Sequence, residues 1–221
     1  MYSLPYFKDN DPAVIKKFIE QHPFAFLAGC DADNQPAVTQ VPLLINEKDN
    51  TFFLVGHIMR QTDHHKAFEK NPNVLCVFTS PHTYVSATWY SDPKQASTWN
   101  YISVHVKGKL KFLDADGLVS VMKKLTLHFE GNNPQSSTIF DNLPDDYTQR
   151  LMKAIIAFEI EVVSIENVFK LSQNRDEKSY YNIIEKLQQQ GSDGSYIADQ
   201  MKQRASQLFA DKKVQNGKLE P

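Results

Sequence analysis

One segment of this chain carries a row of side chains that could together bind a planar, charged ligand. This segment is 101–107, and Trp99 and Asn100 stand directly before it. In a β-strand, alternate residues point to one face. A phenol, a hydroxyl, an imidazole and an ammonium on one face would suit a ligand with ring heteroatoms and negative charge. A solvent-exposed strand face with cross-strand aromatic partners explains the pattern equally well. The row consists of Tyr101, Ser103, His105 and Lys107.

A second group of candidate residues follows the apolar run 52–55. Gly56 ends that run, and His57 and Arg60 come next. A strand that leads into a short helix presents unpaired backbone N–H groups, and arginine adds a forked cation, so together they suit a phosphate group. An arginine on an ordinary surface turn is the alternative interpretation.

The segment 39–42 places a proline inside a run of β-forming residues. Pro42 cannot donate to a sheet ladder, so we expect it at an edge or a bulge. The interrupted ladder would leave backbone groups near Thr39, Gln40 and Val41 free to bond the polar edge of a ring. A proline that only protects an edge strand from pairing is the alternative.

The segment 170–175 concentrates polar side chains between two regular elements. It contains two cations, Lys170 and Arg175, and the amide of Gln173. In a loop, this composition indicates contact with an anion or with the amide-like edge of a ligand. A solvated linker is the competing explanation.

The elements that must position these residues are mainly short strands. Turn-forming residues separate the β-rich runs, and helical spacing of apolar residues marks the helices. Because strands and helices do not alternate, a doubly wound sheet is excluded. We predict a closed or nearly closed barrel with peripheral helices, which is a mainly β, α+β fold. The strands are 24–29, 37–45, 51–57, 74–79, 84–89, 101–113 and 155–165. The helices are 63–69, 116–129 and 145–153, together with a short first helix that Asp11 caps, that begins at Pro12 and that carries apolar residues up to Ile19.

The C-terminal part differs in composition from the rest. Two amphipathic helices are predicted from residue 177 onward, with a break between Gly191 and Gly194. We therefore expect a barrel domain with inserted helices over residues 1–175 and a C-terminal helical segment over residues 176–221.

Composition excludes several functional classes. Hydrophobic residues make up 41% and aromatic residues 11% of the 221 residues, which is typical of a folded globular protein. The formal net charge of −2 gives no overall attraction to nucleic acid or to an anionic membrane. No apolar run approaches membrane-spanning length, and the first residues lack a secretory signal. Cys30 and Cys76 lie in apolar runs, as reduced core cysteines do, so we expect a cytoplasmic protein.

Several motifs of the chain resemble those of the PaiB-type family of FMN-binding negative transcriptional regulators. This family is similar to the flavin-binding split-barrel group that contains pyridoxamine-phosphate oxidases. The most specific motifs are TWNY-x-x-VH at 98–105 and KLSQNR at 170–175. The matching segments are 36–44, 56–60, 84–90, 98–105, 158–160 and 170–175, together with Gly108 and with the start Met1-Tyr2, Pro5 and Phe7.

This resemblance implies a six-stranded split barrel, an obligate homodimer, and FMN bound where two subunits meet. Arg60 would hold the FMN phosphate, and the strand that contains Pro42 would lie along the ring. The segments 101–105 and 170–175 would approach from the second subunit, and the acidic Asp63 would weaken binding at the phosphate. The implied cofactor-binding residues are Thr39, Gln40, Val41, Pro42, His57, Arg60, Trp99, Asn100, Tyr101, His105, Lys170, Gln173 and Arg175.

The sequence leaves three functions open. Family analogy implies a transcriptional regulator whose flavin alters DNA or partner binding, although the C-terminal helices carry mixed charge and no helix-turn-helix pattern. A flavin-dependent oxidoreductase acting on a small molecule is the alternative, with His105 or Tyr101 relaying a proton. A haem-binding protein, with His57, His64 or His65 near the iron, is the third. These histidines lack acidic or cysteine partners at ligand spacing, so we predict no other metal site.

Overall fold

The chain folds into two compact units, and the computed structural model describes residues 4–48 and 51–217 of it, with side chains up to residue 210. Met1 and Tyr2, which belong to the matching motifs, lie outside the described residues. The division into domains at residue 175 stays a prediction. The barrel unit comprises residues 16–78 and 104–166, and the helical unit comprises residues 4–15, 79–103 and 167–217.

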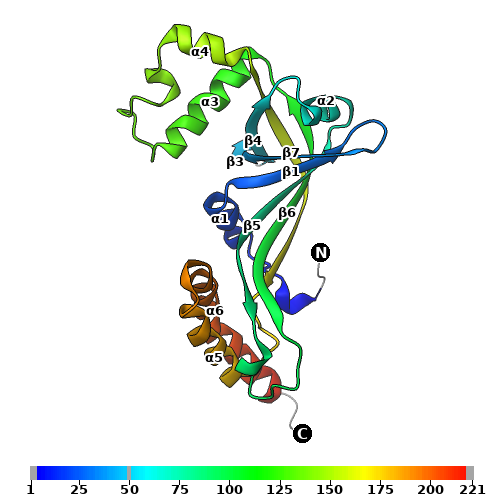
Figure 1. The fold of residues 1–221 in the computed structure, drawn as a ribbon, viewed down its shortest axis with the longest axis vertical. Coiled ribbons are helices and arrows are strands. Elements are labelled where there is room, and N and C mark those ends of the chain that lie inside the picture. Colours follow the sequence, from blue (N-terminus) through cyan, green and yellow to red (C-terminus); the bar gives the residue numbers. More distant parts are fainter. Residues whose placement is uncertain (1–3, 49–50, 218–221) are drawn as a thin grey trace. The chain divides into compact units, whose positions relative to one another are not determined.

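Seven strands form one sheet, in the order β2-β1-β5-β6-β7-β4-β3 (Figure 1). The strands β5, β6 and β7 are long and contribute residues to both units. The predicted α+β class, with strands dominant and helices peripheral, is confirmed. The strands are β1 (Phe24–Cys30), β2 (Pro36–Pro42), β3 (Leu44–Lys48), β4 (Thr51–Met59), β5 (Asn73–Val85), β6 (Thr98–Phe112) and β7 (Ile155–Lys170).

The barrel unit curls so that the two ends of the sheet order meet. β2 and β3 stand at opposite ends of that order, yet only Leu43 separates them along the chain. Gly56 of β4 permits the close approach, since a Cβ there would lie 3.0 Å from the Pro42 carbonyl oxygen and 2.9 Å from Leu43 Cδ2. A curled sheet with adjoining ends is the barrel architecture that the strand pattern predicts.

The predicted strand 37–45 is divided in two. Pro42 ends β2 because it has no N–H to continue the ladder, and the Leu43 N–H donates instead to the Pro23 carbonyl oxygen at 2.8 Å. β2 is an end strand of the sheet, as the proline indicates. The division gives seven strands where the resemblance implies six.

The separate strands predicted over 74–79 and 84–89 are wrong. A single strand, β5, continues through Pro81 as far as Val85, and residues 87–89 form a 3₁₀ helix. The Ser80 hydroxyl accepts a hydrogen bond from the Ile102 N–H at 3.0 Å, which ties β5 to β6 beside the proline.

Three α-helices of the described residues belong wholly to the barrel unit. They are α2 (Asp63–Lys70), α3 (Ala115–Phe129) and α4 (Asp145–Met152). Leu118, Val121 and Leu125 of α3 are buried in a cluster with Leu44 and Val55, so α3 packs on the β3–β4 pair. Such burial stabilises by roughly 1.5–3 kcal/mol for each large apolar side chain.

Two packed helices, α5 (Glu177–Gln188) and α6 (Gly191–Gly217), belong to the helical unit. The predicted break at 191–194 is instead the first turn of α6; the chain turns at residues 189–190, and Gly191, the first residue of α6, has φ +79°. A Cβ on Gly194 would lie 2.3 Å from the Leu187 carbonyl oxygen, so glycine permits the two helices to pack closely there. No described helix is long and apolar enough to cross a membrane.

Candidate functional site

Arg60 lies in the turn between β4 and α2, where the backbone and the side chain are both anchored. Its N–H donates to the Ala154 carbonyl oxygen at 2.9 Å, and its Nε donates to the Ile155 carbonyl oxygen at 2.9 Å. The side chain is exposed, and its two Nη atoms have no partner among the described residues. The guanidinium is therefore held in one orientation with its fork open to an anion.

The N-terminus of α2 is less open than the sequence indicates. The Thr62 hydroxyl accepts from the His65 N–H at 3.3 Å, and the Asp63 carboxylate accepts from the His64 N–H at 2.8 Å. The hydrogen bonds that the His64 N–H and the His64 ring make to the Asp63 carboxylate lower the pKa of Asp63. A carboxylate therefore occupies the helix end beside Arg60, and the backbone contributes less to anion binding there than predicted.

His65 has a structural role in the same turn. It is buried, and its Nδ1 accepts from the Gln61 N–H at 3.3 Å while Gln61 adopts φ +64°. The proton must then reside on Nε2, which lies 3.6 Å from a Glu69 carboxylate oxygen. Within the described ranges, no group of three histidine, cysteine or acidic side chains could hold a metal ion.

His57 is the second polar group of β4 that could meet a ligand. The residue pairs with Ala157 of β7, and burial lowers the pKa of its imidazole, which is therefore neutral at pH 7. Its Nδ1 is buried and has no hydrogen-bond partner in the part of the chain that the structure describes. A buried polar atom without a partner is rare in folded proteins and marks a position where a ligand would complete the bonding.

The other predicted residues of the barrel unit lie on β2 and β6. Thr39, Gln40, Val41 and Pro42 pair with β1, and of these Val41 is buried while Gln40 is exposed. His105 is half-buried on β6. Seven of the predicted cofactor-binding residues thus belong to the barrel unit: Thr39, Gln40, Val41, Pro42, His57, Arg60 and His105.

The predicted polar residues of the helical unit make hydrogen bonds with neighbouring protein groups. Asn100 is fully buried, and its Oδ1 accepts from the Ser172 hydroxyl at 3.0 Å while its Nδ2 donates to Met201 Sδ at 3.5 Å. Gln173 accepts from the Leu171 N–H at 2.8 Å. The solvated-linker interpretation of 170–175 is therefore wrong, because these polar atoms bind neighbouring protein groups.

The two predicted cations of the helical unit, Lys170 and Arg175, also contact protein groups. Arg175 lies over the ring of Tyr90, 4.0 Å from its centroid, and donates to Gln95 and to the Ala96 carbonyl oxygen. Lys170 donates to the Thr98 hydroxyl. Burial, with the nearby charge of Arg175, lowers the pKa of Lys170. Contact of these side chains with a cofactor stays a prediction.

Trp99 and Tyr101 border a small hollow in the helical unit. The hollow has a volume of about 180 Å³, and His82 and Ser80 of β5 contribute to its lining. Trp99 is 51% exposed, and its ring centroid lies 5.7 Å from that of His82. The sequence interpretation missed His82, although its alternation with Tyr84 in β5 was a usable signal.

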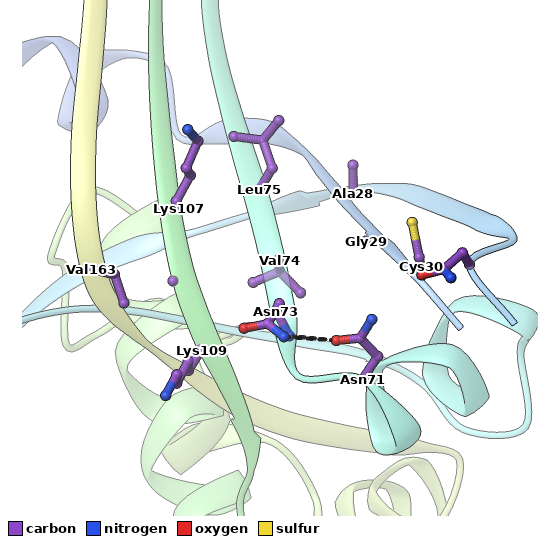
Figure 2. A pocket seen from close by; sticks show the side chains of 12 residues that line it. Ala28, Gly29, Cys30, Asn71, Asn73, Val74, Leu75, Lys107, Lys109 and Val163 are labelled. Carbon is purple, nitrogen blue, oxygen red and sulfur yellow. Dashed lines mark hydrogen bonds between the residues drawn. The ribbon is translucent and has the colours of Figure 1, made fainter. Parts of the chain in front are cut away.

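The barrel unit contains a larger cleft, which is lined by residues that the sequence did not predict as cofactor-binding (Figure 2). Its volume is about 580 Å³, and its residues come from β1, β5, β6 and β7 and from two turns. Only Lys107 belongs to the polar row of the 101–107 strand. None of the predicted cofactor residues lines it.

The curled seven-stranded sheet and the family whose model matches it define the class of the protein, a flavin-binding split barrel. Residues 1–164 match the family model described as "Putative FMN-binding domain", and the chain belongs to this family. The chain is also 33% identical over 188 residues to "Protease synthase and sporulation protein PAI 2" of Bacillus subtilis (strain 168), across 85% of this chain and 89% of that protein. The resemblance to the PaiB-type family is thereby confirmed, and FMN is the cofactor that the family description names.

Solved structures share the fold at low sequence identity. The flavocytochrome Anf3 from Azotobacter vinelandii has a TM-score of 0.56 and 15% identity over 76% of this chain and 72% of that chain. The FAD and heme binding protein from Mycobacterium smegmatis has a TM-score of 0.51 and 13% identity over 73% and 72% of the two chains. At this identity the likeness shows the fold alone.

Proposed function

We propose that this protein is a cytoplasmic homodimer that binds FMN and acts as a flavin-dependent regulator. The observation that carries the cofactor site is the Arg60 guanidinium, which Ile155 fixes at Nε while both Nη atoms have no partner among the described residues. This arrangement pre-organises the two parallel N–H bonds that a phosphate accepts. The free cysteines Cys30 and Cys76 support a reducing compartment.

The flavin ring would lie along β2 and within reach of His57. In the described sheet no strand pairs with the outer edge of β2, so its backbone groups there can bond the polar edge of a ring. The neutral His57 imidazole can exchange one hydrogen bond with a ring heteroatom at the buried Nδ1. When bound, FMN supplies a ring that accepts and donates electrons. The chain binds its phosphate, orients its ring and excludes water.

Exposed apolar side chains of β1 and β2 support the dimer. Phe24 is 60% exposed, Phe26 is 42% exposed and Val38 is 58% exposed. They lie on one sheet face, because Phe26 pairs with Gln40 and the neighbouring Ala28 pairs with Val38. An apolar face of this kind marks an interaction surface, and we assign it to a second copy of the chain, whose Trp99 and Tyr101 would approach the ring.

The regulatory role rests on similarity to the PAI 2 protein, whose name refers to protease synthesis and sporulation. In this role the flavin state of the dimer would alter its binding to DNA or to another partner. The hollow beside Trp99 and Tyr101 supports a second candidate, a flavin-dependent oxidoreductase, because it could admit a small substrate next to the ring. Turnover of a nicotinamide donor would favour the enzyme, and salt-sensitive retention on DNA without turnover would favour the regulator.

The test of the proposed function is an absorption spectrum and a light-scattering mass of the purified protein, taken after incubation with FMN and desalting. We expect flavin bands at one FMN per chain and a mass of twice that of the chain. Phe26→Asp, which puts a carboxylate on the dimer face, should give a monomer that loses FMN. The control Leu151→Asp, at an exposed apolar position of α4, should remain a coloured dimer. A colourless wild type, or a monomer that retains FMN, contradicts the proposal.

A further inference from the structure

The cleft of the barrel unit has the size and walls of a small-molecule site. Its volume of about 580 Å³ falls within the range of roughly 300–1,000 Å³ that is usual for ligand pockets. Leu75 and Val163 provide apolar wall, and Val163 is 66% exposed although it is a β-branched residue in a strand. Gly108 forms part of the lining between Lys107 and Lys109.

The charge of the cleft is positive in a chain whose net charge is −2. Lys107 and Lys109 are two residues apart on β6, so both ammonium groups leave the same face of the strand. Lys107 Nζ lies 3.2 Å from a Glu166 carboxylate oxygen, whereas Lys109 has no acceptor among the described residues. None of the 12 lining residues, all of them described, is acidic. An anion entering the cleft would therefore meet two cations and no lining carboxylate.

Amide side chains at the cleft add directional donors. Asn73 Nδ2 donates to Asn71 Oδ1 at 3.0 Å, and the Asn73 N–H donates to the same oxygen at 3.2 Å (Figure 2). This pairing fixes Asn71 and leaves its Nδ2 group without an acceptor within the described ranges. Asn34, in the β1–β2 turn at φ +60°, also lines the cleft. Amide N–H groups beside two ammonium groups match the many acceptor oxygens of a phosphate better than those of a single carboxylate.

We propose that this cleft binds a phosphate-bearing small molecule of about mononucleotide size, at a site separate from the Arg60 turn. Lys107 and Lys109 supply the charge, Asn71 orients the phosphate, and Leu75 and Val163 contact the rest of the ligand. The proposal does not depend on FMN binding at Arg60, because the two sites share no residue.

The chain contains its own reporter for this cleft. Cys30 lines it and is partly exposed, whereas Cys76, the only other cysteine of the sequence, is fully buried. Burial raises the pKa of the Cys76 thiol to about 12, which keeps it unreactive toward alkylating agents. The rate of iodoacetamide labelling, followed by mass spectrometry, therefore reports the accessibility of Cys30.

The experiment compares labelling rates with inorganic pyrophosphate, adenosine 5′-monophosphate, FMN or uncharged adenosine, at constant ionic strength. At ten times its dissociation constant, a ligand that fills the cleft slows labelling about tenfold, because only about a tenth of the sites stay empty. We expect protection by the mononucleotide and none by adenosine. Protection by pyrophosphate as strong as that by the mononucleotide would identify the ligand as an inorganic phosphate source, and weaker protection would identify an organic ester.

Matched variants decide whether the lysines carry the binding. The double substitution Lys107→Ala with Lys109→Ala should abolish protection, while Lys111→Ala, an exposed lysine further along β6 outside the cleft, should leave it intact. A thermal melt checks that both variants are folded. The proposal is overturned if no phosphate protects Cys30, if the double variant is protected as well as the wild type, or if Cys30 reacts as slowly as Cys76 without ligand. Protection by FMN alone would make the cleft the flavin site and would overturn the claim of a separate one.

Discussion

Replacement of Asn100 by alanine should destabilise the protein even without a cofactor. The Asn100 amide is fully buried, and it links β6 to the 170–175 loop through Ser172 and to α6 through Met201. Ser172, itself buried, adopts φ +62°, a backbone conformation that a non-glycine residue holds only when its surroundings impose it. The amide is therefore expected to fix this loop.

The size of the effect follows from the groups left behind. A buried hydroxyl that loses its acceptor costs about 1–3 kcal/mol, and the space vacated by the amide adds a cavity cost. We expect a loss of about 2–4 kcal/mol in the free energy of unfolding. At about 2–4 °C per kcal/mol for a chain of this length, the melting temperature should fall by roughly 4–16 °C.

The assay is urea unfolding of the cofactor-free protein, followed by circular dichroism and tryptophan fluorescence. Asn174→Ala is the matched control, because this residue is exposed in the same loop, and it should change stability by less than about 0.5 kcal/mol. If Asn100→Ala leaves the apo protein as stable as the wild type but abolishes FMN binding, then Asn100 is a ligand contact and the reasoning is refuted.

Three further predictions concern single positions. Gly108→Ala should cost about 2–3 kcal/mol of stability in urea unfolding, since its Cβ would lie 2.5 Å from the Glu161 backbone oxygen; an unchanged midpoint would contradict the close β6–β7 approach. Asp63→Asn should strengthen FMN binding about threefold to tenfold in a fluorescence titration without changing riboflavin binding, because it removes a carboxylate beside the phosphate; Asp116→Asn, in the first turn of α3, is the control. Asp176 caps α5 by accepting from the Ser179 hydroxyl and the Ser179 N–H, and these two bonds lower its pKa, so Asp176→Ala should cost about 1 kcal/mol near pH 7. This cost should begin to shrink as the pH falls below about 4, the ordinary pKa of an aspartate, and should be lost once the pH falls through the lowered pKa of native Asp176; a cost that stays constant throughout the acid range would contradict the charged cap.

Local patterns predicted the strands that carry the site. The alternation over 101–107 became β6, with Ile102, Val104 and Val106 buried and with Tyr101 and His105 half-buried. This prediction succeeded because the two-residue period of a strand acts on neighbouring residues alone. The proline rule placed β2 at the end of the sheet order for the same reason.

The partners of polar side chains could not be predicted in the same way. The bond between Asn100 and Ser172 joins residues 72 positions apart, and a polar composition does not say whether its partner is protein or ligand. The cleft around Lys109 escaped detection because its walls come from four strands that only the sheet order assembles. The interruption between β2 and β3 at Leu43 depends on a hydrogen bond to the Pro23 carbonyl oxygen, which lies 20 positions earlier in the sequence.

The most direct test of the cofactor site is the affinity of Arg60→Ala for FMN and for riboflavin, measured by flavin fluorescence. Loss of a charge-assisted bond worth about 1.5–3 kcal/mol should weaken FMN binding roughly 10- to 150-fold and leave riboflavin, which has no phosphate, unchanged. Arg150→Ala, an exposed arginine on α4, should behave as the wild type in both titrations. Equal FMN affinity in Arg60→Ala and the wild type would contradict the account, because the phosphate would then bind elsewhere.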